Sequence, residues 1–323
     1  MKRAIVTGCA GFVGSHITRK LLELDYAVVG IDNFRSGKVE FMKDFANNKN
    51  FSFEQLDLNS CENLERYFEG IDIVYHMAAN ADVRGGVENT FVDLQFNVLM
   101  THKILECMRY HGVKRLCFAS TAAALGEPDI FPTPEDISVP IQTSIYGASK
   151  MSCEHFISAY SNYFGIEAYV FRFVSLLGPH YPHGHVIDFV RRLSHDPNEL
   201  RILGDGSARK SYLHITDCVR ALTLICEDIR PALKNKIKYD VYNLGNDGYI
   251  QVRVSAELIA NVMGLRPRFV FEKQVRGWKG DNPFVHLSIE KMKSLGWEPQ
   301  FSIQESIEST VNWLLAEKWI LEK

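Results

Sequence analysis

Short apolar runs alternate in the first half of the chain with longer stretches whose apolar residues recur at helical spacing. The first run, residues 3–7, leads into a glycine-rich segment, after which Ile17, Leu21 and Leu22 recur as on one face of a helix. Further apolar runs predict strands at 27–31, 51–56, 71–76, 113–120 and 166–173. Strands separated by helices predict an α/β fold with a doubly wound parallel sheet of the Rossmann type.

The pattern loosens after Phe173 and predicts a smaller mixed α/β lobe. Strands are expected at 210–214 and 268–272, helices at 255–263 and from near Ile303, and loops at 177–179, 183–185 and 277–283. We therefore expect a Rossmann domain over residues 1–175, to which residues 215–246 return. The smaller lobe then covers residues 176–214 and 247–323.

Composition narrows the class of partner. The chain has 323 residues, of which 46% are apolar, a formal net charge of -3 and no long run of lysine or arginine. We therefore expect neither nucleic acid nor membrane as a partner, but a small molecule. The seven cysteines are scattered without a Cys-x-x-Cys pair, which is typical of a reducing compartment. With neither a signal-peptide pattern nor an apolar run of roughly 20 residues, we expect a cytoplasmic protein.

The segment between the first strand and the first helix carries glycines at positions 8, 11 and 14. Such glycines let the backbone approach a pyrophosphate, whose charge is met by the positive end of the following helix. Asp32 ends the next strand, where a carboxylate accepts hydrogen bonds from an adenosine ribose. The pattern predicts a dinucleotide site that favours NAD over NADP, because Asp32 repels a 2′-phosphate; the nearby cation Arg35 would soften that preference.

Tyr146 and Lys150 lie four residues apart in a predicted helix and therefore share one face. Alone, such a pair is usually an amphipathic aromatic beside a solvated cation, but a preceding dinucleotide site makes it a candidate acid/base pair. Ligands of a parallel sheet gather at the carboxyl ends of its strands. The residues predicted at these ends include Asp32, Asp57, Ala78, Ala79 and Thr121.

Together, these motifs resemble those of the extended short-chain dehydrogenase/reductase family, and within it the nucleotide-sugar 4-epimerases. The resemblance covers nearly the whole chain and rests on residues 7–14, 32–33, 57–58, 76–79, 97–98, 120–121, 146–150, 178–179 and 204–206. It implies NAD binding by the first domain and nucleotide-sugar binding by the smaller lobe. The implied cofactor-binding residues are Gly8, Gly11, Phe12, Val13, Gly14, Asp32, Asn33, Ser36, Asp57, Leu58, Ala78, Ala79, Asn97, Ser120, Tyr146 and Lys150.

The resemblance also implies the catalytic roles. Tyr146 would be the base, Lys150 its partner, and Thr121 would hydrogen-bond the sugar hydroxyl that is oxidised. A phenol titrates near pH 10, and we expect the Lys150 ammonium and a positive nicotinamide ring to lower that pKa.

The choice of reaction within the family depends on acidic residues that this chain lacks after Thr121. Related 4,6-dehydratases need an acid and a base after the strand-end threonine, and related decarboxylases place a glutamate there, whereas this chain has Ala122 and Ala123. The remaining set of Thr121, Tyr146 and Lys150 suffices for 4-epimerisation, in which a transient 4-keto sugar is reduced on its other face.

Around the substrate, the chain departs from the family pattern. Leu125 stands where an aromatic is usual, and Ser175 replaces an asparagine that commonly touches the substrate phosphate. Phe284 falls near the position that limits room at the sugar C2 substituent, although a core phenylalanine is the plain alternative.

The phosphate-binding arginines of the family are also displaced. One falls at Lys210, beside Arg209, and the other at Trp278, which leaves Arg276 or Lys279 as the cation. The expected substrate-binding residues are therefore Val83, Thr121, Ser175, Arg209, Lys210, Arg276, Lys279 and Phe284.

The leading hypothesis is a UDP-glucose/UDP-galactose type 4-epimerase that binds NAD and forms a homodimer through helices 92–110 and 146–164. Plain packing of these helices within one subunit is the alternative. Open alternatives for the function are another nucleotide-sugar epimerase (a uronate, an N-acetyl sugar or another carbon), an NAD-dependent oxidoreductase and a non-catalytic NAD-binding scaffold. His180, His183 and His185 have a spacing that can bind zinc, but the resemblance implies no metal and we expect none.

Overall fold

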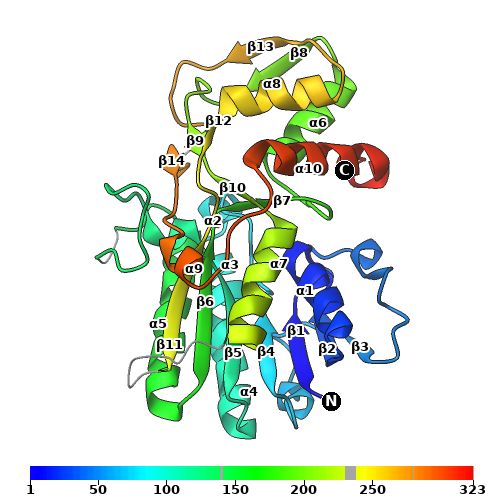
Figure 1. The fold of residues 1–323 in the computed structure, drawn as a ribbon, viewed down its shortest axis with the longest axis vertical. Coiled ribbons are helices and arrows are strands. Elements are labelled where there is room, and N and C mark those ends of the chain that lie inside the picture. Colours follow the sequence, from blue (N-terminus) through cyan, green and yellow to red (C-terminus); the bar gives the residue numbers. More distant parts are fainter. Residues whose placement is uncertain (139–140, 230–237, 279, 323) are drawn as a thin grey trace. The chain divides into compact units, whose positions relative to one another are not determined.

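The computed structural model describes residues 1–138, 141–229, 238–278 and 280–322, and its largest element is a seven-stranded sheet (Figure 1). The strand order is β11-β6-β5-β4-β1-β2-β3. The strands are β1 (Arg3–Thr7), β2 (Ala27–Asp32), β3 (Phe51–Gln55), β4 (Ile73–His76), β5 (Arg115–Thr121), β6 (Glu167–Phe173) and β11 (Tyr239–Leu244). The pairs β1–β2, β1–β4, β2–β3 and β4–β5 are parallel, so the predicted fold class is confirmed.

The order of the strands reverses between β1 and β4, because β2 and β3 extend the sheet to one side and β4, β5 and β6 to the other. In the register of this pair, Thr7 lies beside His76 at the carboxyl ends. Ligands of open α/β sheets bind at such a reversal. The central strands are nearly all buried, as expected where helices cover both faces.

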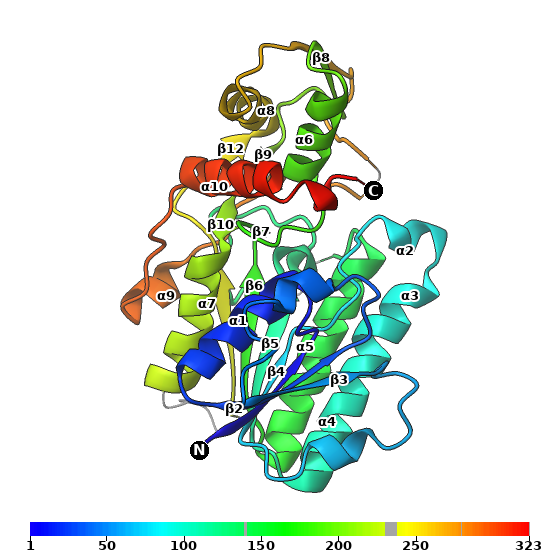
Figure 2. The same cartoon turned by 90° about the vertical axis from the view of Figure 1, so that its right-hand side faces the viewer.

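Helices flank the sheet on both faces, with α1 on one face and α4 and α5 on the other (Figure 2). The helices along this part of the chain are α1 (Phe12–Glu23), α2 (Gly85–Glu88), α3 (Phe91–Asp93), α4 (Met100–His111), α5 (Ile145–Phe164) and α7 (Ile215–Thr223). Shorter turns are η1 (Val39–Met42), η2 (Leu64–Tyr67) and η4 (Ala122–Leu125), and π-helical turns are η3 (Leu94–Leu99) and η5 (Leu224–Ile229).

The predicted helix over residues 92–110 is not one regular helix. It consists of α3, the π-helical η3 and α4, and the wider turn lies around Asn97. Such π-turns recur at functional sites, and apolar periodicity does not signal them. By contrast, α5 begins at Ile145, one residue before the predicted start, because the Ser144 side chain accepts a hydrogen bond from the Gly147 amide.

Contacts along the chain define two compact units, 1–126 with 139–172 and 219–242, and 127–138 with 173–218 and 243–323. The sequence-based domains did not single out residues 127–138. This segment clusters with the second unit because Thr133 pairs with residues 286–288: its amide donates to His286 O at 2.9 Å and its carbonyl accepts from Ser288 N at 2.9 Å.

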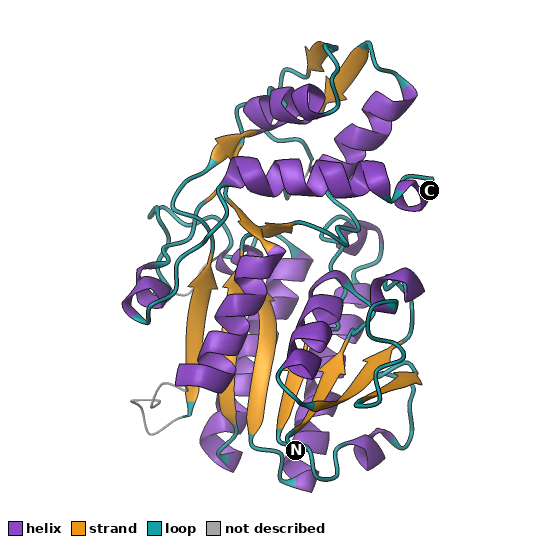
Figure 3. Cartoon of the chain, turned by 45° about the vertical axis from the view of Figure 1, so that its right-hand side comes forward, coloured by secondary structure: helices purple, strands orange, loops and turns teal. Residues whose placement is uncertain are grey.

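The second unit combines small sheets with packed helices, seen as orange arrows and purple coils in Figure 3. Its strands are β7 (Ser175–Leu177), β8 (Glu199–Ile202), β9 (Arg209–Lys210), β10 (Tyr212–His214), β12 (Ile250–Gln251), β13 (Arg268–Phe271) and β14 (Phe284–Val285). Its helices are α6 (His185–His195), α8 (Val252–Val262), α9 (Glu290–Ser294) and α10 (Ile303–Ala316), followed by the short turn η6 (Lys318–Ile320).

Two predictions for this unit were wrong. The expected strand at 210–214 is two strands: β9 joins the β12-β9-β14 sheet, whereas β10 pairs with β7. The break falls at Ser211, whose amide donates to Val285 O at 2.9 Å. His185 was expected in a loop but begins α6, because Gly184 allows a φ of 123° directly before it. In the described part of the chain, no helix has both the length and the apolar character needed to span a bilayer.

Candidate active site

The loop between β1 and α1 leaves no space for a side chain at Gly8 or Gly14. A Cβ at Gly8, where φ is +71°, would lie 2.8 Å from Ala78 N, and a Cβ at Gly14 would lie 1.8 Å from Gly8 O. The Gly11 amide donates to Gly8 O at 2.9 Å, which closes the turn. α1 then begins at Phe12 and continues through Val13, so the amides of its first turn form a positively polarised helix end. This geometry fits a pyrophosphate group.

Asp32 links this loop to the end of β2. Its Oδ2 accepts from Ala10 N at 3.0 Å and its Oδ1 from Phe34 N at 2.8 Å, and the residue is 8% exposed. Burial raises the pKa of this carboxyl group, while the backbone donors act in the opposite direction. Arg35 is stacked over Phe96 at 3.9 Å, so its guanidinium is engaged with an aromatic ring.

Several other predicted cofactor residues lie at the same edge of the sheet. Asn33 Nδ2 donates to Asp57 Oδ2 at 3.0 Å, which joins the ends of β2 and β3. Ala78 N donates to Thr7 Oγ1 at 3.2 Å, and Ala79 follows it after β4. Ser36 is exposed, whereas Leu58 is buried in the core of the first unit. The arrangement therefore brings the dinucleotide candidates to one edge but leaves Leu58 a core side chain.

Two predicted cofactor residues are bonded to protein side chains. Asn97 Nδ2 donates to Ser149 Oγ at 2.8 Å, and its Oδ1 accepts from Asn80 N at 2.9 Å. Ser120 Oγ donates to Glu154 Oε1 at 2.6 Å. Both polar groups thus hold neighbouring segments in place, and a role in cofactor binding stays a prediction.

The catalytic candidates come together where α5 approaches the end of β5. A Cβ on Gly147 would lie 2.4 Å from Ala123 O, so this glycine permits the close approach. Tyr146 is 9% exposed, and the Thr121 side chain is near enough to oppose the rise of its pKa. Thr121 Oγ1 also accepts from Ala123 N at 3.1 Å. Tyr146 and Thr121, which are 25 positions apart, therefore form one polar centre.

Lys150 occupies the same face of α5 and is 3% exposed. Its Nζ donates to Ala119 O at 2.9 Å and lies 4.8 Å from the centre of the Phe118 ring. Beside it, His76 shares hydrogen bonds with Thr7 and Thr101. Burial and the Lys150 charge lower the pKa of His76 to about 3, so this histidine is neutral.

The pKa of Tyr146 is shifted in the direction opposite to the expectation from sequence. Burial raises it to about 12, Asp93 adds to the rise, and among the described residues Thr121, not Lys150, opposes it. The sequence shows that a lysine is near but not that the phenol is buried, and desolvation outweighs the neighbouring charge. Lowering the pKa to working pH therefore requires a further positive charge at the site.

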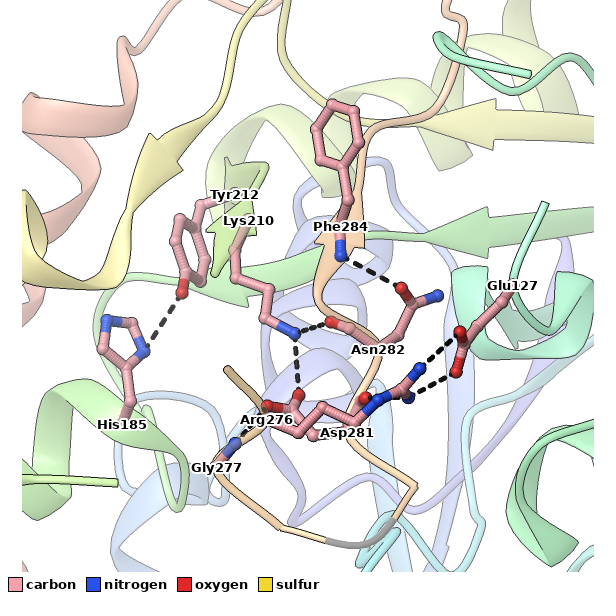
Figure 4. A network of polar contacts seen from close by, with 9 residues as sticks. All are labelled: Glu127, His185, Lys210, Tyr212, Arg276, Gly277, Asp281, Asn282 and Phe284. Carbon is pink, nitrogen blue, oxygen red and sulfur yellow. Dashed lines mark hydrogen bonds and ion pairs between the residues drawn. The ribbon is translucent and has the colours of Figure 1, made fainter. Parts of the chain in front are cut away.

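In the second unit, the expected phosphate-binding cations already have acidic partners (Figure 4). Lys210 Nζ donates to Asp281 Oδ1 at 2.8 Å and also to Asn282 O. Arg276 forms a two-pronged ion pair with Glu127 at 2.5 and 2.7 Å, and this pair lowers the pKa of Glu127. Lys279 lies outside the described residues.

Arg209 and Phe284 are engaged with each other. The Arg209 guanidinium lies 3.8 Å from the centre of the Phe284 ring, and Phe131 stacks on that ring at 4.2 Å. Arg209 is therefore a stacking partner, in contrast to Lys210. Ser175 is exposed at the start of β7, and Val83 is half-buried before α2. Their contact with a substrate stays a prediction.

The three histidines do not form a metal cluster. His185 Nε2 and Ser255 Oγ are 2.8 Å apart, and the His185 ring stacks on Tyr212. His180 packs edge-on against Trp313. Within residues 1–138, 141–229, 238–278 and 280–322, no group of three or more His, Cys, Asp or Glu side chains is arranged to hold a metal ion.

Sequence reasoning missed Glu154 and Asp93. Glu154 lies one helical turn after Lys150, so the same four-residue spacing that pairs Tyr146 with Lys150 was a signal for it. Asp93 is fully buried; its Oδ1 accepts from Asn80 Nδ2 at 2.8 Å, and its Oδ2 has no hydrogen-bond partner among the described residues. No local pattern marks Asp93, because its neighbours depend on the π-turn that follows it.

Comparisons with known proteins show the family to which the chain belongs. The model of the NAD dependent epimerase/dehydratase family matches residues 4–245. The chain is 31% identical over 316 residues to a putative UDP-glucose 4-epimerase of Methanocaldococcus jannaschii, a match that covers 96% of this chain and 97% of that protein.

Two solved structures show how closely different enzymes share this fold. The UDP-glucose 4-epimerase of Thermotoga maritima with UDP-glucose has a TM-score of 0.86 at 32% identity, covering 98% of this chain and 99% of that chain. A dTDP-glucose 4,6-dehydratase of Streptomyces venezuelae with NAD bound has a TM-score of 0.87 at 25% identity, covering 99% of both chains. The fold thus does not separate epimerases from dehydratases, and the chain belongs to the NAD-dependent epimerase/dehydratase family.

Proposed function

We propose that this enzyme is an NAD-dependent epimerase that inverts C4 of a UDP-sugar of the glucose/galactose type. One observation carries the choice within the family: Tyr146 and Thr121 lie together, Lys150 shares the helix face of Tyr146, and the positions next to Thr121 are Ala122 and Ala123. Ala122 is 9% exposed. Neither alanine can donate or accept the proton that removal of water from the sugar requires.

The residues of the first unit fit NAD, given the glycine turn at Gly8, the helix end at Phe12 and the carboxylate of Asp32. When bound, NAD supplies the hydride acceptor and donor. Its positive nicotinamide ring is also the further charge that the buried Tyr146 phenol requires. We assign Lys150 to the nicotinamide ribose.

Tyr146 removes the proton from the C4 hydroxyl, and Thr121 orients that hydroxyl by a hydrogen bond. The 4-keto sugar then turns over, and Tyr146 returns the proton as the opposite face is reduced. Oxidation and reduction cancel, so catalysis consumes no added NAD.

For the diphosphate, we propose Lys210 and Arg276 as the cations. Lysine meets a phosphate as a point charge and arginine as a bidentate fork. Asp281 and Glu127 hold the two cations in their present positions. UDP-sugar binding would therefore exchange a carboxylate for a phosphate oxygen at each cation, and the displaced Asp281 and Glu127 carboxylates would then be hydrated or bonded elsewhere.

We also propose a homodimer in the cytoplasm. The elements α3, η3, α4 and α5 carry large exposed apolar side chains, and a second copy packing on residues 91–111 and 145–164 would bury them. These side chains include Phe91, Leu94, Leu99 and Phe156, between 43% and 53% exposed. None of the seven cysteines, all of which lie within the described residues, is in a disulfide, which suits a reducing compartment. Light scattering of the purified protein tests the dimer: the mass of one chain would contradict it.

The function is tested with a panel of UDP-, GDP-, CDP- and dTDP-sugars followed by proton NMR without added NAD. We expect UDP-glucose and UDP-galactose to interconvert, with no NADH released to solution. A panel in which no sugar changes configuration at C4 would refute the proposal, and soluble NADH with an oxidised sugar would indicate a one-way oxidoreductase.

A further inference from the structure

Glu154 and Arg172 form a buried ion pair in the first unit, next to the catalytic face of α5. Glu154 is 1% exposed and Arg172 is 6% exposed. Arg172 Nη2 donates to Glu154 Oε2 at 2.7 Å and Arg172 Nε to Glu154 Oε1 at 3.0 Å. Such pairs contribute little to stability when compared with apolar residues of the same size, because both charges lose their hydration. Stability alone therefore does not explain why Glu154 and Arg172 are buried as a pair.

The carboxylate of Glu154 is also bonded to the catalytic strand. Ser120 Oγ donates to its Oε1 at 2.6 Å, and Ser120 directly precedes Thr121. One residue earlier, Ala119 O accepts from Lys150 Nζ at 2.9 Å. α5 thus holds two consecutive residues at the end of β5, one through Lys150 and one through Glu154. This arrangement sets the position from which Thr121 projects.

Glu154 also acts on Lys150 through its charge. Burial lowers the pKa of Lys150, whereas the negative forms of Cys153, Glu154 and Asp93 would raise it. The groups around the ammonium are Cys153 and Glu154 on α5, Asp93 on α3, neutral His76 on β4, and the Phe118 ring and Ala119 carbonyl on β5. The cysteine is a thiol at neutral pH, because burial raises its pKa. The carboxylates Glu154 and Asp93 therefore supply the negative charge that favours the ammonium.

We propose that Glu154, fixed by Arg172, is a positioning residue of the catalytic centre. It holds the Ser120–Thr121 strand end at α5 and stabilises the charged form of Lys150. The expected effect of Glu154 on catalysis rests on the proposed function. Its effect on the charge of Lys150 does not depend on that function.

The test is a Lys150 titration by NMR of protein labelled at the lysine ε-carbons, with K150R used to assign the resonance. Replacing Glu154 by Gln removes the negative charge, so Lys150 is expected to lose its proton at a pH lower by about one unit. In E154Q, the pH above which kcat falls is expected to be lower as well, because Lys150 then loses its charge at a lower pH. The Ser120→Ala variant breaks the bond to the strand without changing charge; we expect a lower kcat and an unchanged Lys150 midpoint.

Glu167→Gln is the matched control, since Glu167 forms an exposed ion pair with Lys238 on the same strand as Arg172. It should leave both measurements unchanged. Should E154Q fail to fold because it leaves Arg172 unpaired, the double variant E154Q/R172M removes both charges and is expected to lower the midpoint as well. A folded E154Q or E154Q/R172M variant with the wild-type Lys150 midpoint overturns the inference. If wild type instead yields no epimer while the midpoint moves, the proposed function fails and the electrostatic role stands.

Discussion

The proposed catalytic pair of the first unit, Tyr146 and Lys150, is buried, whereas the proposed phosphate-binding cations of the second unit, Lys210 and Arg276, are held by ion pairs. Lys150 is 3% exposed and Tyr146 is 9% exposed, and both are held by their own helix and the adjoining strand. Lys210 and Arg276 instead have carboxylate partners 71 and 149 positions away, and the Arg276 side chain is 44% exposed. The proposed catalytic groups thus lie in a buried arrangement of one helix and one strand, whereas the proposed substrate cations depend on partners far away in the sequence.

The strongest test of this contrast is Tyr146→Phe, which removes the phenol but keeps the ring. We expect kcat to fall by about 10²–10⁴-fold, because Tyr146 is the proposed base for the C4 proton. KM should change little. Tyr163→Phe is the control on the same helix, since Tyr163 is 78% exposed. Equal loss in the two variants would show that the effect comes from the helix and not from the base.

In the second unit, Lys210→Met should raise KM and leave kcat nearly unchanged, since Lys210 binds substrate and transition state equally well. Loss of a charged hydrogen bond corresponds to about 10–100-fold in KM. Arg209→Met is the matched control, because its guanidinium lies over Phe284. Steady-state kinetics decide between them: a KM that rises in R209M but not in K210M would make Arg209, and not Lys210, the phosphate cation.

Gly147→Ala tests the close packing of the first unit. The added Cβ would meet Ala123 O at 2.4 Å, so α5 must shift away from η4, at a cost of about 1–3 kcal/mol in the free energy of unfolding. Gly248→Ala in the second unit has nothing within 4 Å of the added Cβ and serves as the control. Urea unfolding of both variants measures the difference. No loss in G147A would mean that the approach of α5 to η4 is not tight.

The smallest effect is expected for Asp93→Asn. The Asp93 charge raises the pKa of Tyr146, so its removal should lower that pKa, and the acidic limb of the kcat profile should move to lower pH by less than about one unit. Glu88→Gln, at the exposed end of α2, is the control. A shift to higher pH in D93N would contradict the assigned sign.

The sequence predicted the first unit well for physical reasons that act over short distances. The strand–glycine–helix pattern, Asp32 at a strand end and the four-residue spacing of Tyr146 and Lys150 are local, and local patterns survive folding. The burial of Tyr146 that raises its pKa was not visible, because it depends on Gly147 and η4. The single-helix prediction over 92–110 failed because a π-turn changes the helical phase around Asn97.

The second unit was less predictable because its contacts are long-range. Nothing near Arg276 indicates Glu127 as its partner, and nothing near Arg209 indicates that it stacks on Phe284 rather than remaining available to a phosphate. The strand prediction over 210–214 treated two strands of different sheets as one, because their split at Ser211 is decided by pairing with β14 and β7. Apolar periodicity carries no information about such partners.

In the proposed mechanism, the same bound NAD oxidises C4 and reduces it again, so the hydrogen on C4 never exchanges with water. UDP-galactose that carries deuterium at C4, incubated with the enzyme in ordinary water and followed by NMR, gives the clearest test. We expect UDP-glucose that retains the deuterium at C4, because the hydride never reaches solvent. Loss of deuterium to water, or a 4-keto-6-deoxy product, would contradict it.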